Sequence, residues 1–467
     1  MAISILLILL IGGIVVREAF LSATAAPAIS VDYAERINAR VQEANKSFPA
    51  PQGDFAAFTY ILRELSQADQ ALAATAFPNQ DSPMVPYDAL YTPSESAENR
   101  TLAERGLAEH IASGRLESLA QLPSLVGVSR HIPSDALLIG VTLPELRDAR
   151  NVARILTARF VIAAREGREE DATAELERLV ALGTILTHQA TLIDRLVGIA
   201  VHSLAINAIR DLHAEGHLSG ALATRLLPVM QRIDIRPSYA LQLNTERDST
   251  LDVIQRTHSR HGRLIPSEYT RILGGFSPLK PWQLSAFLPR KAETEALTNT
   301  YYDGVIAAAA QPAASRQFAT LDAIADSDST SPVIKAMIPA LSRTLASEDQ
   351  LLTTLHGVQI LLGLEVHRAR AGAYPQSLNE LVPGVFTQLP IDVIAKDGAF
   401  KYVRRPADVT TGRPFLLYSI GRDQTDNQGT EHPKVDVTAL SVSKEHAGFD
   451  FVINRTRLDQ TPQPSAP

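Results

Sequence analysis

The chain has 467 residues, 45% hydrophobic and 20% charged, which is the balance of a globular protein with a buried core. Its 44 basic and 51 acidic residues give a net charge of −7, and this balance disfavours a nucleic-acid-binding protein, which would need a basic face. Cysteine is absent, so disulfides, thiolate nucleophiles, zinc–sulfur sites and iron–sulfur clusters are excluded.

The first 30 residues are predicted to be a membrane anchor or a signal segment. Ala2–Val16 is an uncharged run, apolar except for Ser4. A signal peptide carries such a stretch before a small-residue cleavage site, and Ala23-Thr24-Ala25 supplies one. An uncleaved anchor would continue past Arg17-Glu18, whose side chains can reach the interface, and a buried core helix is the third alternative. The first two predict an inner-membrane protein facing the periplasm, or an exported protein.

Residues 31–325 are predicted to form a helical body. Apolar residues recur at helical spacing in 32–46 and 54–75, and a third helix is expected over about 94–119. Further helices are predicted at 192–209, from about 219, and at 238–257, 283–310, 334–345 and 348–371. The segment 326–332 is the best linker candidate, because it is rich in Asp and Ser and ends in Pro.

The clearest helical pattern begins at Thr142-x-x-Glu145, which has the form of a capping box. Apolar residues then recur at intervals that alternate between three and four residues. Gly167 ends this helix, and a second helix repeats the spacing. Segment 167–179 resembles the middle of a tetratricopeptide repeat, but a 34-residue shift finds no second copy. The residues that carry this resemblance are Gly167, Ala172, Leu176 and Leu179. An irregular stack of helical hairpins is therefore expected.

Residues 333–445 are predicted to hold a long helix and a small α/β module. After the helix come a Gly-Tyr-Pro turn, a Leu-rich segment, a Leu-Pro-x-Asp step, a Tyr-rich hairpin and a Ser-x-Gly-x-Asp loop. Over about 346–430 this order resembles the globular end of the major pseudopilins of type II secretion systems. The matching residues are Gly372, Tyr374, Pro375, Leu378, Leu381, Pro390, Asp392, Gly398, Tyr402, Tyr418, Ser419, Gly421 and Asp423.

The resemblance implies that 399–404 pairs with 415–419 as an antiparallel hairpin, with both faces of the second strand fairly apolar. The chain also departs from that family. Its apolar N-terminal run lies more than 300 residues before the module and lacks the family's Glu at the fifth mature position. It is therefore not expected to be a pilus subunit, and the final residues, 446–467, are expected to be a tail with a disordered end.

The loop 423–429 is the candidate metal site. In the pseudopilins this loop binds calcium through carboxylate and carbonyl oxygens, the hard ligands that Ca²⁺ requires. The resemblance therefore implies a calcium site at Asp423 and Asp426, with Asn427 and Glu431 as additional oxygens. A turn rich in Asx residues explains the same composition without a metal. No other cofactor is expected.

The helical body offers ionisable pairs but no recognised catalytic motif. Histidines occur in three pairs that favour loop or structural roles over metal binding. These pairs are His213/His217, His258/His261 and His188/His202. Asp194-Arg195 interrupts an apolar helix, which favours ion pairing between helices over orientation of a substrate.

A cluster of charged residues on the 238–257 helix has two interpretations. Acidic residues at i,i+4 could serve acid–base chemistry, but a solvated helix face explains them without a second catalytic element. The cluster consists of Glu246, Arg247, Asp248 and Asp252.

The sequence thus predicts a mainly α protein, with an irregular helical-hairpin body and a small C-terminal α/β module. The favoured function is a non-enzymatic scaffold or interaction protein of the cell envelope, with protein partners and no nucleic acid. The alternative is a hydrolase or lyase whose unrecognised site lies in the helical body and uses Glu246 and Asp248 or the histidines.

Overall fold

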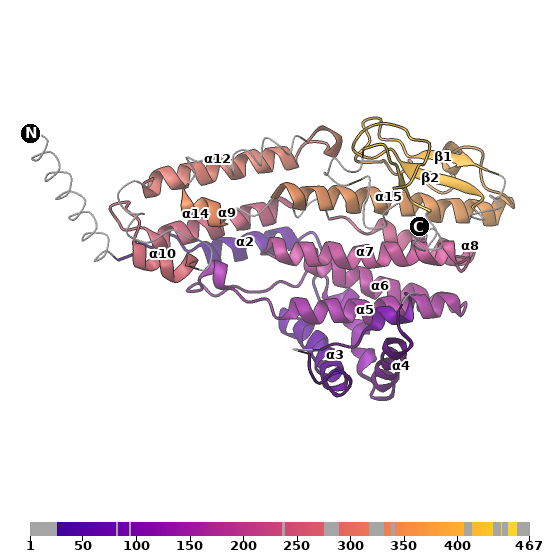
Figure 1. Ribbon diagram of the computed structural model, residues 1–467, viewed down its shortest axis with the longest axis horizontal. Coiled ribbons are helices and arrows are strands. Elements are labelled where there is room, and N and C mark those ends of the chain that lie inside the picture. The colour runs from indigo at the N-terminus through magenta and orange to yellow at the C-terminus, as the bar shows by residue number, and fades with distance from the viewer. Residues whose placement is uncertain are drawn as a thin grey trace, which may run out of the picture.

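The computed structural model is an elongated stack of helices with a small sheet at one end (Figure 1). It describes residues 26–80, 83–92, 95–235, 239–274, 289–316, 331–337, 341–405, 413–432, 440 and 447–454. The predicted N-terminal anchor or signal run and the end of the predicted tail lie outside the described residues. The predicted fold class, mainly α with a small antiparallel sheet, is confirmed.

Helices occupy most of the described chain. The α-helices are α2 (Tyr33–Asn45), α3 (Phe55–Ala76), α4 (Ala97–Ala112), α5 (Glu145–Arg165), α6 (Glu169–Thr187), α7 (Leu192–Ala214), α8 (Gly220–Gln231), α9 (Tyr239–Thr257), α10 (Pro266–Leu273), α12 (Lys291–Ala309), α14 (Pro332–Met337) and α15 (Leu341–Ala371). Short 3₁₀ helices are η1 (Tyr87–Leu90), η2 (Arg115–Leu125), η3 (Leu138–Gly140), η5 (Ala313–Ser315) and η6 (Leu378–Leu381).

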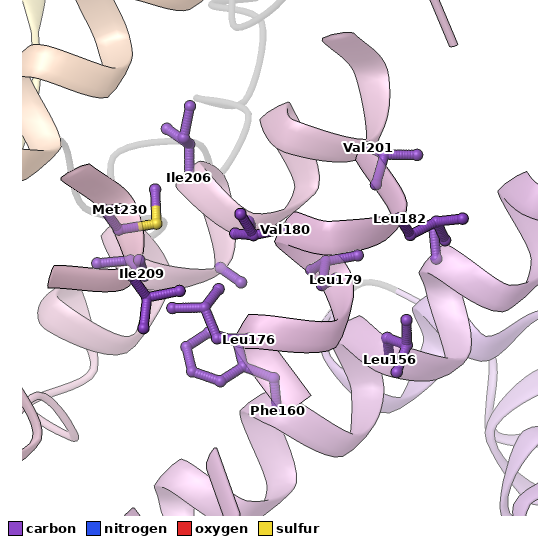
Figure 2. Packing of buried hydrophobic residues seen from close by; sticks show 14 of the residues in the cluster. Leu156, Phe160, Leu176, Leu179, Val180, Leu182, Val201, Ile206, Ile209 and Met230 are labelled. Atoms are coloured by element: carbon purple, nitrogen blue, oxygen red, sulfur yellow. The ribbon is translucent and has the colours of Figure 1, made fainter. Parts of the chain in front are cut away.

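The centre of the stack is built from α5, α6 and α7, each packed on the next. Gly167, with φ +71°, ends α5 and turns the chain into α6, so the predicted helical hairpin is confirmed. Figure 2 shows Phe160 of α5 beside Leu176 of α6, within a core that also takes side chains from α7 and α8. Gly198 lets α7 approach α6 closely, because an added Cβ would lie 2.7 Å from the backbone nitrogen of Thr187.

The predicted capping box at Thr142 is wrong. Helix α5 begins at Glu145 with Pro144 at the cap position, and no side chain caps it. The Glu145 carboxylate is used elsewhere, since it accepts a hydrogen bond from Nε of Arg130 at 2.8 Å. The Thr-x-x-Glu pattern is present in the sequence, but the Glu145 side chain pairs with Arg130 and does not cap the helix.

The third predicted helix is shorter than expected. Helix α4 ends at Ala112, and Gly114, with φ +70°, breaks it. The chain then continues as η2, a 3₁₀ helix that contains Pro123. Apolar spacing continues through η2, where Leu116, Leu119, Leu122 and Leu125 are buried, and this continuity explains why one helix was expected.

Helix α15 is continuous, although two helices separated near Leu345 were expected. It spans Leu341–Ala371 and packs on α7 and α8. Of the predicted linker, 326–330 lie outside the described residues, and Pro332 begins α14. One hydrophobic core contains Phe58 of α3, Leu361 of α15 and Ile453 near the C-terminus, so the C-terminal module shares its core with the helical body.

The sheet consists of β1 (Lys401–Arg404), β2 (Phe415–Ser419) and β3 (Phe451–Val452), antiparallel in the order β1-β2-β3. Lys401 pairs with Tyr418 and Arg404 with Phe415, so the predicted hairpin is confirmed. All of β2 is buried, as its two apolar faces predicted. Because β3 pairs with β2, the module extends past residue 445, where the tail was predicted to begin.

Among the described residues, α7 is long and apolar enough to cross a membrane, but 67% of its most apolar window is buried inside the protein. It carries the fully buried Asp194 and Arg195 and packs between α6 and α15. These contacts are those of a central core helix.

Candidate functional site

Asp194 and Arg195, at the start of α7, join three parts of the fold. Arg130 donates to both carboxylate oxygens of Asp194, at 2.8 and 2.9 Å. Arg195 donates from NH2 to Oε2 of Glu348 on α15 at 2.8 Å and to the carbonyl oxygen of Ile235 at 2.7 Å. The predicted ion pairing between helices is therefore confirmed for Arg195, whereas Asp194 pairs with Arg130 in the loop after η2.

Glu348 lies at the wall of a pocket of about 730 Å³, which we call the Glu348 pocket. Three segments that are distant in sequence form it: residues 309–316, the first half of α15, and the turn 391–398. The charged residues among its lining are Arg316, Glu348, Asp349, Asp392, Lys396 and Asp397. A concave site with apolar walls and a few polar groups is the usual form of a ligand site.

The acidic doublet Glu348-Asp349 forms ion pairs with three arginines. Arg195 pairs with Glu348, while Asp349 pairs with both Arg316 and Arg422. Burial nevertheless raises the pKa of Glu348 and of Asp349 above their ordinary values, although the arginines act in the opposite direction. The charged forms of these two carboxylates are thus incompletely compensated by the protein.

Asp392 shapes the turn that closes the pocket. Its Oδ1 accepts from the backbone N–H groups of Ile394 and Ala395, at 3.1 and 3.3 Å. Its own N–H donates to the carbonyl oxygen of Gly398 at 2.9 Å. Burial raises the pKa of Asp392 as well. The Asp of the Leu-Pro-x-Asp step is therefore a turn-forming residue in this chain.

The interpretation of the α9 charges as a solvated face is wrong, because Asp248 and Asp252 are buried and Glu246 and Arg247 are partly buried. Oε1 of Glu246 accepts from the backbone N–H of Leu192 at 3.2 Å. Asp248 pairs with Arg36 and Arg40 of α2, and Asp252 pairs with Arg256. Since these carboxylates contact different elements, they do not converge on one catalytic centre.

The histidines are also structural. His188 and His258 are buried, and the Nδ1 of each donates to a backbone carbonyl four residues earlier. His213, predicted in a surface loop, lies instead in the last turn of α7, with Nε2 3.2 Å from Oε1 of Glu365 on α15. His217 lies exposed in the loop between α7 and α8, and His261 lies exposed in a turn, as expected for both.

His202 is fully buried on α7, and neither ring nitrogen has a hydrogen-bond partner among the described residues. Burial lowers its pKa from 6.5 to about 3, and the nearby His188 and Arg195 act in the same direction. The folded protein therefore binds this proton much more weakly than the unfolded chain does.

We expect His202 to make the protein sensitive to acid. Its contribution is complete above pH 6.5 and is lost as the pH falls toward about 3, because only the unfolded chain is protonated in that window. Each pH unit should remove about 1.4 kcal/mol. Denaturant titrations at several pH values give the free energy of unfolding at each pH. That free energy should fall less steeply with decreasing pH in His202→Leu than in the wild type. Val201→Ala, a neighbouring core change without a titrating group, should lower stability equally at every pH.

The predicted calcium loop forms a hydrogen-bonded turn. The two Asp423 oxygens accept from the N–H groups of Thr425 and Gly448, at 3.0 and 2.8 Å. Oδ1 of Asp426 accepts from the Tyr418 hydroxyl at 3.0 Å. The described residues contain no group of three or more His, Cys, Asp or Glu placed to hold a metal ion. These contacts fit the Asx-turn interpretation, and calcium binding stays a prediction.

The residues of the Glu348 pocket were not predicted as a site. A signal was present, since Glu348-Asp349 is an acidic doublet at the start of the predicted 348–371 helix, but its partners come from distant segments. Comparisons with protein-family models, with curated proteins and with solved structures find no match. The resemblances to pseudopilins and to a tetratricopeptide hairpin therefore stay expectations from the sequence.

Proposed function

We propose that the protein is a non-enzymatic helical scaffold or interaction protein of the cell envelope, held by its N-terminal segment and facing the extracytoplasmic side. The observation that supports this function is the use of buried charge. Asp194, Arg195 and Asp248 each pair with a residue of another segment, so they fix the helical stack instead of converging on a reactive centre. A stack of helices offers long faces to partners.

A hydrolase or lyase is the second candidate, and the Glu348 pocket favours it. A buried carboxyl with a raised pKa in a cleft has the properties of a general acid or base. The adjacent Asp349 is held by two arginines, which makes it a poor second catalytic group. Because the pocket offers one suitable catalytic carboxyl and not two, we rank the enzyme as the second candidate.

Location and interaction can be tested together on intact cells. A membrane-impermeant, cleavable lysine cross-linker should modify Lys46, whose side chain is 70% exposed, without lysis. Lys46→Arg should abolish that modification at this position. Modification of Lys46 only after lysis would contradict the extracytoplasmic location.

The same samples report on partners. A scaffold should give discrete, reproducible cross-linked species of higher mass, released by cleavage of the reagent. An enzyme that acts on small molecules should give only singly modified chain. That second pattern, with Lys46 still modified, would contradict the scaffold function and leave the location intact.

A further inference from the structure

The two carboxylate oxygens of Glu348 differ in their hydrogen bonds to the described residues. The residue is 4% exposed and lines the pocket. Its Oε2 accepts from Arg195, whereas its Oε1 accepts no hydrogen bond from any described residue. Oε1 is not among the fully buried atoms that lack a partner, so it can be reached from the pocket, and a donor brought in by a ligand can bond to it there.

The guanidinium group in the pocket wall, that of Arg316, donates to other acceptors. Arg316 donates from Nε to the carbonyl oxygen of Gln311 at 3.2 Å, from NH2 to that of Ala309 at 2.9 Å, and from NH1 to Asp349. Lys396 is exposed at the turn. Since burial outweighs the arginines at both Glu348 and Asp349, a donor with positive charge is favoured over a neutral one.

One part of the pocket lining is apolar and suits an alkyl chain. It includes Ala309, Ala310, Pro312 and Ala313 on one side and Leu352 of α15 on another. Small apolar side chains of this kind leave a passage that a methylene chain can fill, with its charged end at the carboxylate.

We propose that the Glu348 pocket binds an alkylammonium group, with the ammonium N–H donating to Oε1 of Glu348 and the alkyl chain lying along the alanines of 309–313. The source of that group depends on the proposed function. In an interaction protein it is a lysine side chain of a protein partner, and the same chemistry is found in a free alkylamine.

The test is calorimetric titration of the purified full chain with Nα-acetyl-lysine methylamide. Saturable binding is expected, at least about tenfold tighter than that of the norleucine analogue, which has the same stem without the amine. Glu348→Gln should weaken binding of the lysine probe by about tenfold, and Glu43→Gln, a surface carboxylate 72% exposed, should leave it unchanged.

A second variant tests the pocket independently, in case Glu348→Gln does not fold. Ala314, half-buried in the pocket lining, can be replaced by Phe to fill the space while Glu348 and Arg195 are both kept. Ala314→Phe should also abolish binding while its thermal unfolding stays cooperative. No saturable heat, equal binding of the norleucine analogue, or wild-type binding by both pocket variants would overturn the proposal.

A titration with n-pentylamine distinguishes the two sources. Binding weaker than that of the lysine derivative supports a protein side chain, and equal binding supports a free amine. Because this experiment uses only the purified chain, its failure would leave the cross-linking test of the scaffold function unaffected.

Discussion

Replacing Arg195 with leucine is expected to lower the free energy of unfolding by about 3–5 kcal/mol. The side chain is fully buried, and its NH2 group holds Glu348 at 2.8 Å and the carbonyl oxygen of Ile235 at 2.7 Å. Without the guanidinium, Glu348 keeps its burial and loses the cation that opposes it. Denaturant unfolding of the purified chain, followed by far-ultraviolet circular dichroism, measures the loss.

An exposed pair provides the matched control. Arg232 donates to Glu177 at 2.6 Å, but their side chains are 61% and 41% exposed, so Arg232→Leu should change stability by less than about 1 kcal/mol. The double change of Arg195 and Glu348 to leucine should recover most of the loss, leaving about 1 kcal/mol for the lost hydrogen bond from Arg195 to the Ile235 carbonyl. An Arg195→Leu loss equal to that of Arg232→Leu would contradict the structural role of this pair.

Periodicity predicted the helices because burial and helical spacing agree in this chain. Helices α2, α3 and α9 begin and end within about two residues of their expected limits. Asp32 and Asp54 cap the first two through their side chains, so local chemistry and apolar pattern point to the same boundaries. At α15 two helices with a break near Leu345 were expected, but one helix spans Leu341–Ala371.

The hairpin was predictable because both faces of β2 carry apolar residues. Phe415 and Leu417 enter the main core on one face, and Leu416 and Tyr418 form a smaller cluster on the other. Period-two alternation assigns these faces directly from the sequence. Two or three strands were expected, but the position of the third was not, because β3 is only two residues long.

The burial of the α9 carboxylates was not predictable, because some of their partners lie far away in the sequence. Asp248 pairs with Arg36 and Arg40, more than 200 residues earlier. Acidic residues spaced along an amphipathic helix look the same whether they face water or a distant arginine. The Glu348 pocket was missed for the same reason, since it exists only where three separate segments meet.

Replacing Phe160 with alanine is expected to lower the free energy of unfolding by about 3–5 kcal/mol, through lost apolar burial and the cavity left behind. Phe160 is fully buried on α5 and lies beside Leu176 of α6 (Figure 2). Leu176→Ala should have a loss at the low end of that range. Because both side chains fill the same contact, the double variant should lose less than the sum of the two single changes.

Tyr60→Ala is the control, since Tyr60 lies on α3 with 65% of its surface exposed and should change stability by less than about 0.5 kcal/mol. If Phe160→Ala and Leu176→Ala both unfold with the same denaturant midpoint as the wild type, the α5–α6 packing is contradicted. The expected loss is large because α5 and α6 lie at the centre of the stack, where α3, α7 and α8 also pack on them. A cavity at Phe160 therefore has few exposed neighbours that could move in to fill it.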